Sequence, residues 1–272
     1  MRELTIGKND AGARLDRFLG KALPLLPPAL AQKYIRIKRV KVNGGRAQRD
    51  QRLQEGDVLQ LYINDEFFDK PSEENMFLTL FKPRLTVVYE DEHLLLADKP
   101  QGMVVHADET EKVNTLINHI QAYLYQKREW NPRWENAFAP ALCNRIDRNT
   151  GGIVIAAKDA ETLRLINEKI RLRELDKRYL CVTVGRPKRD SGRAECFLLK
   201  DEQKKQVTVY HKPVPGGKTA ITDYRVLETR GELSLVEIGL ETGRTHQIRA
   251  TMADLGCPLL GDGKYGRGDV NR

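Results

Sequence analysis

Five short apolar runs constrain the fold of this chain most strongly, because each has the length and the composition of a β-strand. They occupy residues 94–97, 153–157, 180–184, 222–227 and 233–238. Two amphipathic segments lie between some of these runs, and each follows a residue that can cap a helix, Asn114 in one case and Asp159 in the other. Together the strand and helix patterns predict an α+β domain of catalytic size.

The length and composition of the chain predict a folded protein with two domains. A chain of 272 residues can hold one large domain and one small one. Hydrophobic residues make up 40% of the sequence and charged residues 31%, which is enough apolar material for a packed core. The formal net charge of +8 favours a polyanionic partner, although the distribution of the charge is more informative than its sum.

The first 66 residues predict a small, basic α/β module. Two helical stretches between residues 14 and 37 precede strand-like residues 40–44, which end in an Asn-Gly turn, and a second strand at 58–63. Basic residues gather between Lys33 and Arg52, where Asp50 is the only acidic residue. Such segregation is typical of a phosphate-binding face, whereas a solvated helix face is the ordinary explanation of a charge run.

This module resembles the S-four-like domain, a small RNA-binding unit, over about residues 12–64. The resemblance lies in residues 14–19, in the basic helix that follows and in residues 40–44 and 56–58. It implies that the basic face binds RNA. We assign to that face the residues Lys33, Arg36, Lys38, Arg39 and Lys41. Residues 67–85 have the composition of a linker, and residues 86–272 form the predicted catalytic domain.

Several classes of protein are excluded by motifs that the sequence lacks. The cysteines are far apart and form no CxxC pair, so we expect no metal and four reduced thiols, at Cys143, Cys181, Cys196 and Cys257. The chain has no GxGxxG, Walker loop or HExxH, which argues against dinucleotides, nucleoside triphosphates and metalloprotease chemistry. No stretch approaches the roughly 20 apolar residues that span a bilayer. We expect a cytoplasmic monomer without a cofactor.

A charged stretch with a glycine pair, residues 144–152, runs directly into the second apolar run. Two-residue alternation would place Arg145 and Asp147 on one face, opposite the apolar residue between them. The flanking arginines favour the ionised form of Asp147, which suits a nucleophile better than a general acid. Gly151 and Gly152 permit the close approach of another backbone. From spacing alone, a catalytic carboxylate and an ordinary Arg–Asp turn network are equally open.

Residues 145–157 resemble the signature of the RluA family of pseudouridine synthases, His-Arg-Leu-Asp-Arg-Asp-Thr-Ser-Gly followed by an aliphatic run, and its aspartate falls on Asp147. Residues 89–106, 177–179 and 242–249 resemble further motifs of that family in the same order and spacing. The resemblance covers about residues 12–266 and implies a mixed, largely antiparallel central sheet with flanking helices. This sequence departs from the signature at three places. Asn144 replaces the usual histidine, Asn149 replaces the usual aspartate, and Gly151-Gly152 stands where serine–glycine is common.

The resemblance implies an isomerisation of uridine within RNA that needs no metal and no cofactor. The reaction breaks the bond from ribose to a ring nitrogen, turns the base and joins ribose to a ring carbon, and it requires a carboxylate beside the ribose. Asp147 would supply it, as nucleophile or as base. Tyr179 would stack on the base and act as a general base, and we expect it on the face opposite the core residues Leu180 and Val182. Arg244 would pair with Asp147.

The segment from Thr242 to Leu255 predicts a helix with Thr242 as its N-cap. Arg244 would then lie in the first turn, where a cation opposes the helix dipole unless an anion such as Asp147 compensates. His246 and Arg249, three residues apart on one helical face, would bind phosphate or support the loop. The remaining residues that we assign to substrate binding are Arg145, Arg148, Thr150 and Lys177.

Three functions fit these features. The first is an RNA pseudouridine synthase that acts on ribosomal RNA, with the large subunit favoured; the second acts on transfer RNA. The third is an inactive RNA-binding protein on the same scaffold, which the presence of Asp147, Tyr179 and Arg244 disfavours. A nucleoside hydrolase would have no need of the basic module. Relatives continue into further strands beyond Gly266, so we expect a catalytic domain that is truncated at its C-terminal end.

Overall fold

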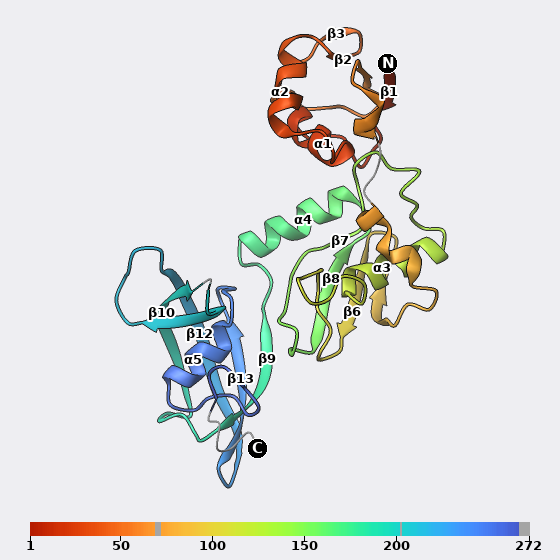
Figure 1. The fold of residues 1–272 in the computed structure, drawn as a ribbon. Coiled ribbons are helices and arrows are strands. Elements are labelled where there is room, and N and C mark those ends of the chain that lie inside the picture. Colours follow the sequence, from red (N-terminus) through yellow and green to blue (C-terminus); the bar gives the residue numbers. More distant parts are fainter. Residues whose placement is uncertain (69–71, 202, 267–272) are drawn as a thin grey trace. The chain divides into compact units, whose positions relative to one another are not determined.

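The computed structural model describes residues 1–68, 72–201 and 203–266, which form two compact units (Figure 1). Unit 1 is Met1–Glu168, and unit 2 is Lys169–Arg272. The predicted S-four-like domain and the first part of the predicted catalytic domain both belong to unit 1. Residues 69–71 of the predicted linker, together with residue 202 and residues 267–272 of the predicted catalytic domain, lie outside the described residues. The predicted domain boundaries stay predictions.

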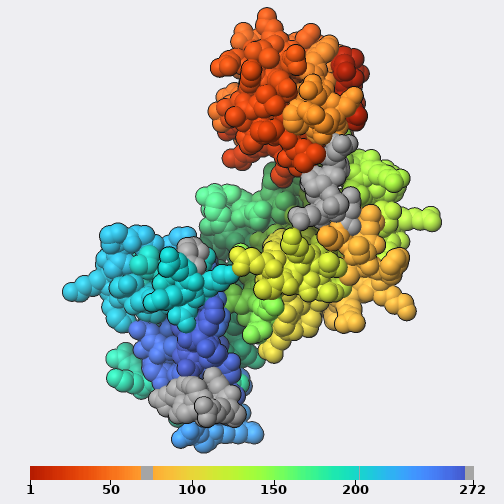
Figure 2. Space-filling model, viewed as in Figure 1, coloured from red at the N-terminus to blue at the C-terminus, as the bar shows by residue number. Residues whose placement is uncertain are grey.

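The N-terminal module has two helices and a four-stranded antiparallel sheet, and its atoms gather into one closed cluster, red to orange in Figure 2. The helices are α1 (Leu15–Ala22) and α2 (Pro28–Arg36). The strands, in sheet order, are β1 (Arg2–Thr5), β4 (Val58–Leu61), β2 (Val40–Val42) and β3 (Gly45–Arg46). Leu15, Leu19, Val40, Leu59 and Leu61 are fully buried in its core. The predicted Asn-Gly turn is confirmed, because Asn43 and Gly44 join β2 to β3 with positive φ angles of 51° and 75°.

The rest of unit 1 contains, in its described residues, a second antiparallel sheet and the helix α3 (Leu116–Gln126). In sheet order the strands are β5 (Thr86–Glu90), β6 (Leu94–Lys99), β8 (Gly152–Ala157) and β7 (Ala141–Leu142). The helix α4 (Ala160–Arg171) begins in unit 1 and ends in unit 2. In the register of β6 with β8, Lys99 lies opposite Gly152. This pairing places the end of β6 beside the glycine pair at which β8 begins.

One of the two predicted helix caps is confirmed, and the other is wrong by one residue. Asp159 caps α4, since its Oδ1 accepts the N–H of Thr162 at 2.8 Å. At α3 the cap is Thr115, whose Oγ1 accepts the N–H of Asn118 at 3.3 Å. Asn114 belongs to the preceding turn, where its own N–H donates to Glu111 at 2.9 Å.

Unit 2 is a five-stranded antiparallel sheet with one helix. In sheet order its strands are β11 (Gln206–Tyr210), β10 (Ser191–Asp201), β12 (Lys218–Arg230), β13 (Leu233–Leu240) and β9 (Arg178–Val184). The helix α5 (Gln247–Asp254) contributes Ala250 and Met252 to two apolar clusters with the sheet. Ala220, Val236 and Ile238 supply the fully buried sheet side of those clusters. The α+β class and the antiparallel pairing therefore agree with the sequence.

The segment with linker composition carries an aromatic anchor. It contains two 3-10 helices, η1 (Asp65–Phe68) and η2 (Ser72–Thr79). Phe77 is 1% exposed, and its ring lies 5.1 Å from that of Trp130 and 5.7 Å from that of Tyr125. Part of this segment is thus held to α3 and the loop that follows it. Among the described residues no helix is both long enough and apolar enough to cross a bilayer.

Replacing Phe77 by alanine should destabilise unit 1, because it removes a buried ring from an aromatic cluster. We expect the free energy of unfolding to fall by about 3 kcal/mol. Urea unfolding followed by tryptophan fluorescence measures this, since both tryptophans, Trp130 and Trp134, lie in unit 1. Phe81→Ala is the matched control, because Phe81 is 88% exposed. An unchanged midpoint for Phe77→Ala would show that the segment is a loose tether.

Candidate active site

Asp147 lies in the loop between β7 and β8, in unit 1. Its side chain is half-buried, while Ile146 is 8% exposed and Arg145 is exposed, which is the alternation expected from the sequence. The carbonyl of Asp147 accepts the N–H of Thr150 at 3.0 Å and so closes a turn over residues 147–150. The carboxylate is therefore carried at the start of a tight turn, partly accessible to solvent.

A buried lysine, Lys99, is hydrogen-bonded to the backbone of this turn. The Nζ of Lys99, at the end of β6, is fully buried and donates to the carbonyls of Met103, Pro100 and Arg148 at 2.8, 2.9 and 3.0 Å. The carbonyl of Arg148 also accepts the N–H of Gly102 at 2.8 Å. Burial lowers the pKa of Lys99, and the charge of nearby Asp147 partly offsets that effect. Lys99 thus links β6 to the carbonyl of Arg148, the residue after Asp147. No motif in the sequence indicated this role.

The side chain of Arg148 is held by the loop that follows β6. Its Nη2 donates to Thr110 Oγ1 at 2.6 Å and to Asp108 Oδ2 at 2.9 Å. Hydrogen bonds from Thr110, and then from Arg148, keep the pKa of Asp108 well below its usual range. Substrate binding by Arg148, Arg145 and Thr150 stays a prediction.

Asn144, which stands where the RluA signature has histidine, ties the loop to β8. Its Oδ1 accepts the N–H of Ile155 at 2.8 Å, and its Nδ2 donates to the carbonyl of Ile153 at 3.4 Å. A Cβ on Gly151 would lie 3.5 Å from the carbonyl oxygen of Lys99, an ordinary contact distance, so close backbone approach at the glycine pair stays a prediction. Gly152 has a φ of +125°, which side-chain-bearing residues rarely adopt.

In unit 2, Tyr179 lies on β9 and packs, half-buried, against the apolar cluster of α5 and β13. The prediction that Leu180 and Val182 are core residues is wrong, because they are 65% and 39% exposed. Tyr179 and Cys181 occupy the core-facing positions instead. Both faces of this strand carry apolar side chains, so alternation alone could not decide which one faces inward.

Arg244 precedes α5 and is not part of it. The predicted start of the helix at Thr242 is wrong: α5 begins at Gln247, and His246 occupies the N-cap with a left-handed φ of 52°. The argument that Arg244 opposes a helix dipole therefore does not apply. Arg244 is exposed, and its Nε donates to the carbonyl of Thr219 at 2.9 Å.

Gln247 shapes the loop that carries Arg244, and the sequence analysis missed this role as well. Its buried Oε1 accepts from the hydroxyl of Thr242 at 2.9 Å and from the N–H of Arg244 at 3.0 Å. Its Nε2 donates at 3.0 Å to the carbonyl of Ile221 and to the hydroxyl of Thr222, both on β12. All four bonds run from one amide, so Gln247 fixes residues 242–244 against the sheet.

Lys177 and Arg244 form a cluster of positive charge within unit 2. Burial lowers the pKa of Lys177, and the nearby guanidinium groups of Arg173 and Arg244 lower it further. A Cβ on Gly243 would lie 3.9 Å from the Nζ of Lys177. Cations that raise one another's energy in this way favour an anion beside them. Asp147 lies in unit 1, so the predicted ion pair between Asp147 and Arg244 would join two units and stays a prediction.

His246 and Arg249 both contact the segment after α5. Arg249 forms a two-point ion pair with Asp262, with Nε–Oδ2 and Nη2–Oδ1 both at 2.7 Å, and it lies over the ring of Tyr265. The Nδ1 of His246 lies 2.9 Å from the hydroxyl of Tyr265. Burial opposes ionisation of Asp262, but the bonds from Arg249 and two backbone N–H groups lower its pKa overall. These contacts support the loop, which is one of the two roles predicted for the pair.

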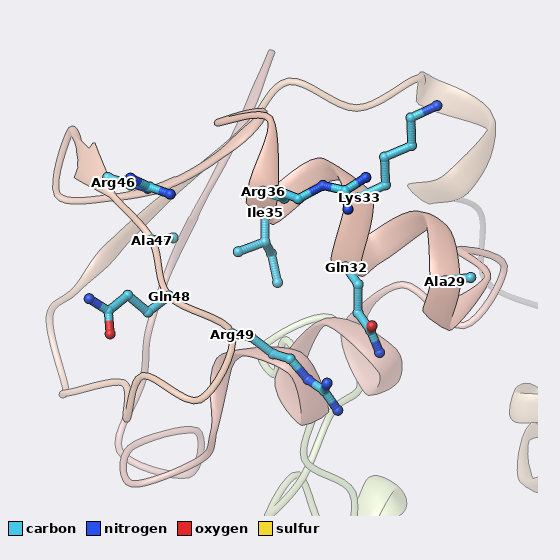
Figure 3. A pocket seen from close by; sticks show the side chains of 9 residues that line it. All are labelled: Ala29, Gln32, Lys33, Ile35, Arg36, Arg46, Ala47, Gln48 and Arg49. Atoms are coloured by element: carbon cyan, nitrogen blue, oxygen red, sulfur yellow. The ribbon is translucent and has the colours of Figure 1, made fainter.

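The basic face of the S-four-like domain divides into two parts. Lys33 and Arg36, with Arg46 and Arg49, line a hollow of about 670 Å³ (Figure 3). Lys38, Arg39 and Lys41 do not line it. The guanidinium of Arg39 lies 5.5 Å from the ring centre of Tyr34, and the ammonium of Lys41 lies 5.4 Å from that of Tyr62. Among the described residues, no group of three or more His, Cys, Asp or Glu side chains could hold a metal ion.

Comparisons with known proteins match the chain to two sequence families. The sequence model of the family described as RNA pseudouridylate synthase matches residues 93–254, and that of the S4 domain matches residues 13–59. The uncharacterized RNA pseudouridine synthase YlyB of Bacillus subtilis is 30% identical over 265 residues, which cover 97% of this chain and 82% of that protein. The ribosomal large subunit pseudouridine synthase C of Rickettsia typhi is 31% identical over 268 residues, which cover 94% and 83%.

A solved structure shares the fold. Human RNA pseudouridylate synthase domain containing 4 superposes with a TM-score of 0.56 at 22% identity, over 73% of this chain and 74% of that one. Fold and sequence together define an RNA-modifying isomerase with an appended RNA-binding module. The chain belongs to the RNA pseudouridylate synthase family, which confirms the family predicted from the sequence.

Replacing Lys99 by methionine should destabilise unit 1, because it leaves the carbonyls of Pro100 and Met103 without this donor. We expect the free energy of unfolding to fall by about 3 kcal/mol, as unmade hydrogen bonds to buried groups cost roughly 1–3 kcal/mol each. Tryptophan fluorescence in urea measures it. Lys82→Met removes the same charge from an exposed site and should change stability by less than about 0.5 kcal/mol. Equal effects of the two variants on stability would contradict the role of Lys99 in fixing this turn.

The ion pair of Asp262 should make the stability of unit 2 depend on pH. The folded-state pKa of Asp262 is lowered, so its contribution is present above the unfolded pKa of about 3.9 and is lost as pH falls through the folded value. At about pH 7, Asp262→Asn should speed hydrogen exchange of the α5 amides by roughly 10- to 100-fold, the equivalent of about 1.5–3 kcal/mol. The ratio to wild type should be smaller at about pH 3, below the unfolded pKa, than at about pH 7.

Asp176→Asn is the control for this measurement, since that side chain is 88% exposed. Its exchange should follow wild type at both pH values. A ratio for Asp262→Asn that does not change with pH would contradict the role of the ionised carboxylate.

Proposed function

We propose that this pseudouridine synthase acts on ribosomal RNA of the large subunit and that Asp147 is its catalytic carboxylate. One observation supports the role of Asp147 above the others: a half-buried aspartate stands on a turn whose adjacent carbonyl is bound by both Lys99 and Gly102. Such a preorganised support is what a catalytic group requires. Its position in the RluA signature points to the same residue.

The reaction gives the carboxylate a defined task. The bond from ribose to the ring nitrogen breaks, the base turns, and a bond forms from ribose to a ring carbon, which then loses its proton. Asp147 attacks covalently or removes a proton during this rearrangement. The target nucleotide must first leave the helical stack, at a cost of a few kcal/mol, because its ribose and base are inaccessible in a duplex. Binding energy from the rest of the RNA offsets that cost.

We also propose roles in the reaction for residues of unit 2. Tyr179 packs against the core cluster but is only half-buried, and through its accessible part it contacts the extruded base and takes the proton from the ring carbon of the product. Arg244 and Lys177 hold an anion, which is the carboxylate of Asp147 or a phosphate of the RNA. Burial and the neighbouring guanidinium groups lower the pKa of Lys177, and an anion beside this cluster would offset that effect.

The choice of ribosomal RNA rests on a relative's name. The Rickettsia typhi protein is named a ribosomal large subunit pseudouridine synthase, and it matches 94% of this chain. Transfer RNA is the alternative substrate, against which ribosomal RNA is to be compared. We therefore expect product in large-subunit ribosomal RNA and not in transfer RNA.

Release of tritium from the ring carbon of labelled uridine tests both parts of the proposal. Wild-type protein should release tritium from large-subunit ribosomal RNA, and Asp147→Asn should be slower by about 10,000-fold or more, as expected for a group essential to the chemical step. Asp98→Asn removes a negative charge from an exposed residue of β6 and should keep wild-type rates.

The alternatives predict other results. Near-normal release by Asp147→Asn would sink the catalytic assignment, and release from transfer RNA alone would sink the substrate assignment. Binding of RNA by wild type without any release would identify an inactive RNA-binding protein.

A further inference from the structure

The hollow of the S-four-like domain has an apolar floor and polar walls. Helix α2 forms one wall, and residues 46–49 form the other (Figure 3). Ile35 and Ala47, at 5% and 3% exposure, line its base. A volume of about 670 Å³ lies within the range of roughly 300–1,000 Å³ that is usual for small-molecule sites. It is large enough for one nucleotide.

Three of the cations that line the hollow have no protein partner. Across residues 1–68, 72–201 and 203–266, no ion pair and no side-chain hydrogen bond engages Lys33, Arg36 or Arg46. Arg49 differs, because its Nε donates to Asp16 at 3.0 Å. A bond from Arg14, and then that from Arg49, lower the pKa of Asp16 to about 2, so this carboxylate stays charged and is already occupied. The hollow therefore carries an uncompensated positive charge that suits phosphate.

Two features distinguish this hollow from a flat phosphate-binding surface. They are its apolar floor and the side-chain amides of Gln32 and Gln48. A continuous duplex would place phosphates on the cations and leave the hollow between them unfilled. An unpaired base would cover Ala47 and Ile35, while Gln32 and Gln48 on the two walls offer donors and acceptors to its edge. Proteins that read RNA sequence mostly bind such unstacked bases.

We propose that this hollow binds one unpaired nucleotide of the RNA, with the base on Ala47 and Ile35 and the flanking phosphates on Lys33, Arg36 and Arg46. This inference rests on the proposed function, since it concerns how the enzyme holds its RNA substrate. The nucleotide bound here is distinct from the uridine that is modified, because the hollow contains no carboxylate. The S-four-like domain thereby selects RNA that has a bulge or a loop.

Binding of two RNA hairpins to the full-length chain tests the proposal. The hairpins are identical except that one carries a single bulged adenosine. Because contacts to one base contribute about 1–3 kcal/mol, wild type should prefer the bulged hairpin by roughly 5- to 150-fold in fluorescence anisotropy. Ala29→Phe fills the hollow from an exposed position on α2 without a change of charge, and it should abolish the preference.

Two charge variants separate the hollow from the rest of the basic face. Arg36→Gln with Arg46→Gln should weaken binding of the bulged hairpin, remove the preference and lower the slope of log affinity against log salt by about 1.4–1.8. Arg39→Gln with Lys41→Gln removes the same charge outside the hollow, so affinity for both hairpins should fall together and the preference should persist.

Equal binding of the two hairpins by wild type would overturn the proposal, and so would a preference that survives in Ala29→Phe. Tritium release from ribosomal RNA by the same wild-type preparation reports separately on the proposed function. Loss of release with an intact bulge preference would overturn the catalytic proposal alone. Normal release without any bulge preference would overturn the hollow alone.

Discussion

The hydrogen bonds of the buried Lys99 ammonium are the interaction on which the loop that carries Asp147 depends. The ammonium joins the end of β6, the loop that follows and the turn after Asp147. It does so by hydrogen bonds to three carbonyls, which accept from no other side chain among the described residues. A desolvated lysine is costly unless all its protons are bound, and here they are. The same ammonium lies near the carboxylate of Asp147, so one group both fixes the loop and adds positive charge beneath it.

In unit 2 the loop that carries Arg244 is fixed by a neutral side chain, that of Gln247. The amide of Gln247 binds a strand, a hydroxyl and the backbone of Arg244, and it places that arginine in a loop without the use of charge. The two arrangements are alike, because each polar group is buried and fully paired while the side chain proposed to act in catalysis, Asp147 or Arg244, is left at least partly accessible. The bidentate pair of Arg249 and Asp262 holds the next segment in a similar manner.

Strands with continuous apolar runs, such as β6 and β8, were predictable from sequence, although only alternate residues of β6 are fully buried and Ile153 of β8 is exposed. Strands β10 and β11 were missed because polar residues interrupt their apolar residues, although the alternation in β11 is itself a strand signal. The start of α5 was missed because Thr242, a good cap by type, gives its hydroxyl to Gln247, a tertiary contact that local propensity does not contain. Asp147 was predicted as a site residue from its setting and its motif, and that stays a prediction, whereas Lys99 was overlooked because lysines are almost never fully buried.

Asn144 has a consequence for how the enzyme responds to its surroundings. A histidine at this position, as in the RluA signature, changes its charge near pH 6.5, within the range that cells experience. An amide neither gains nor loses a proton there, so its bonds to Ile153 and Ile155 persist from acid to alkaline conditions. The attachment of the loop that carries Asp147 to β8 is therefore insensitive to acidification over this range of pH.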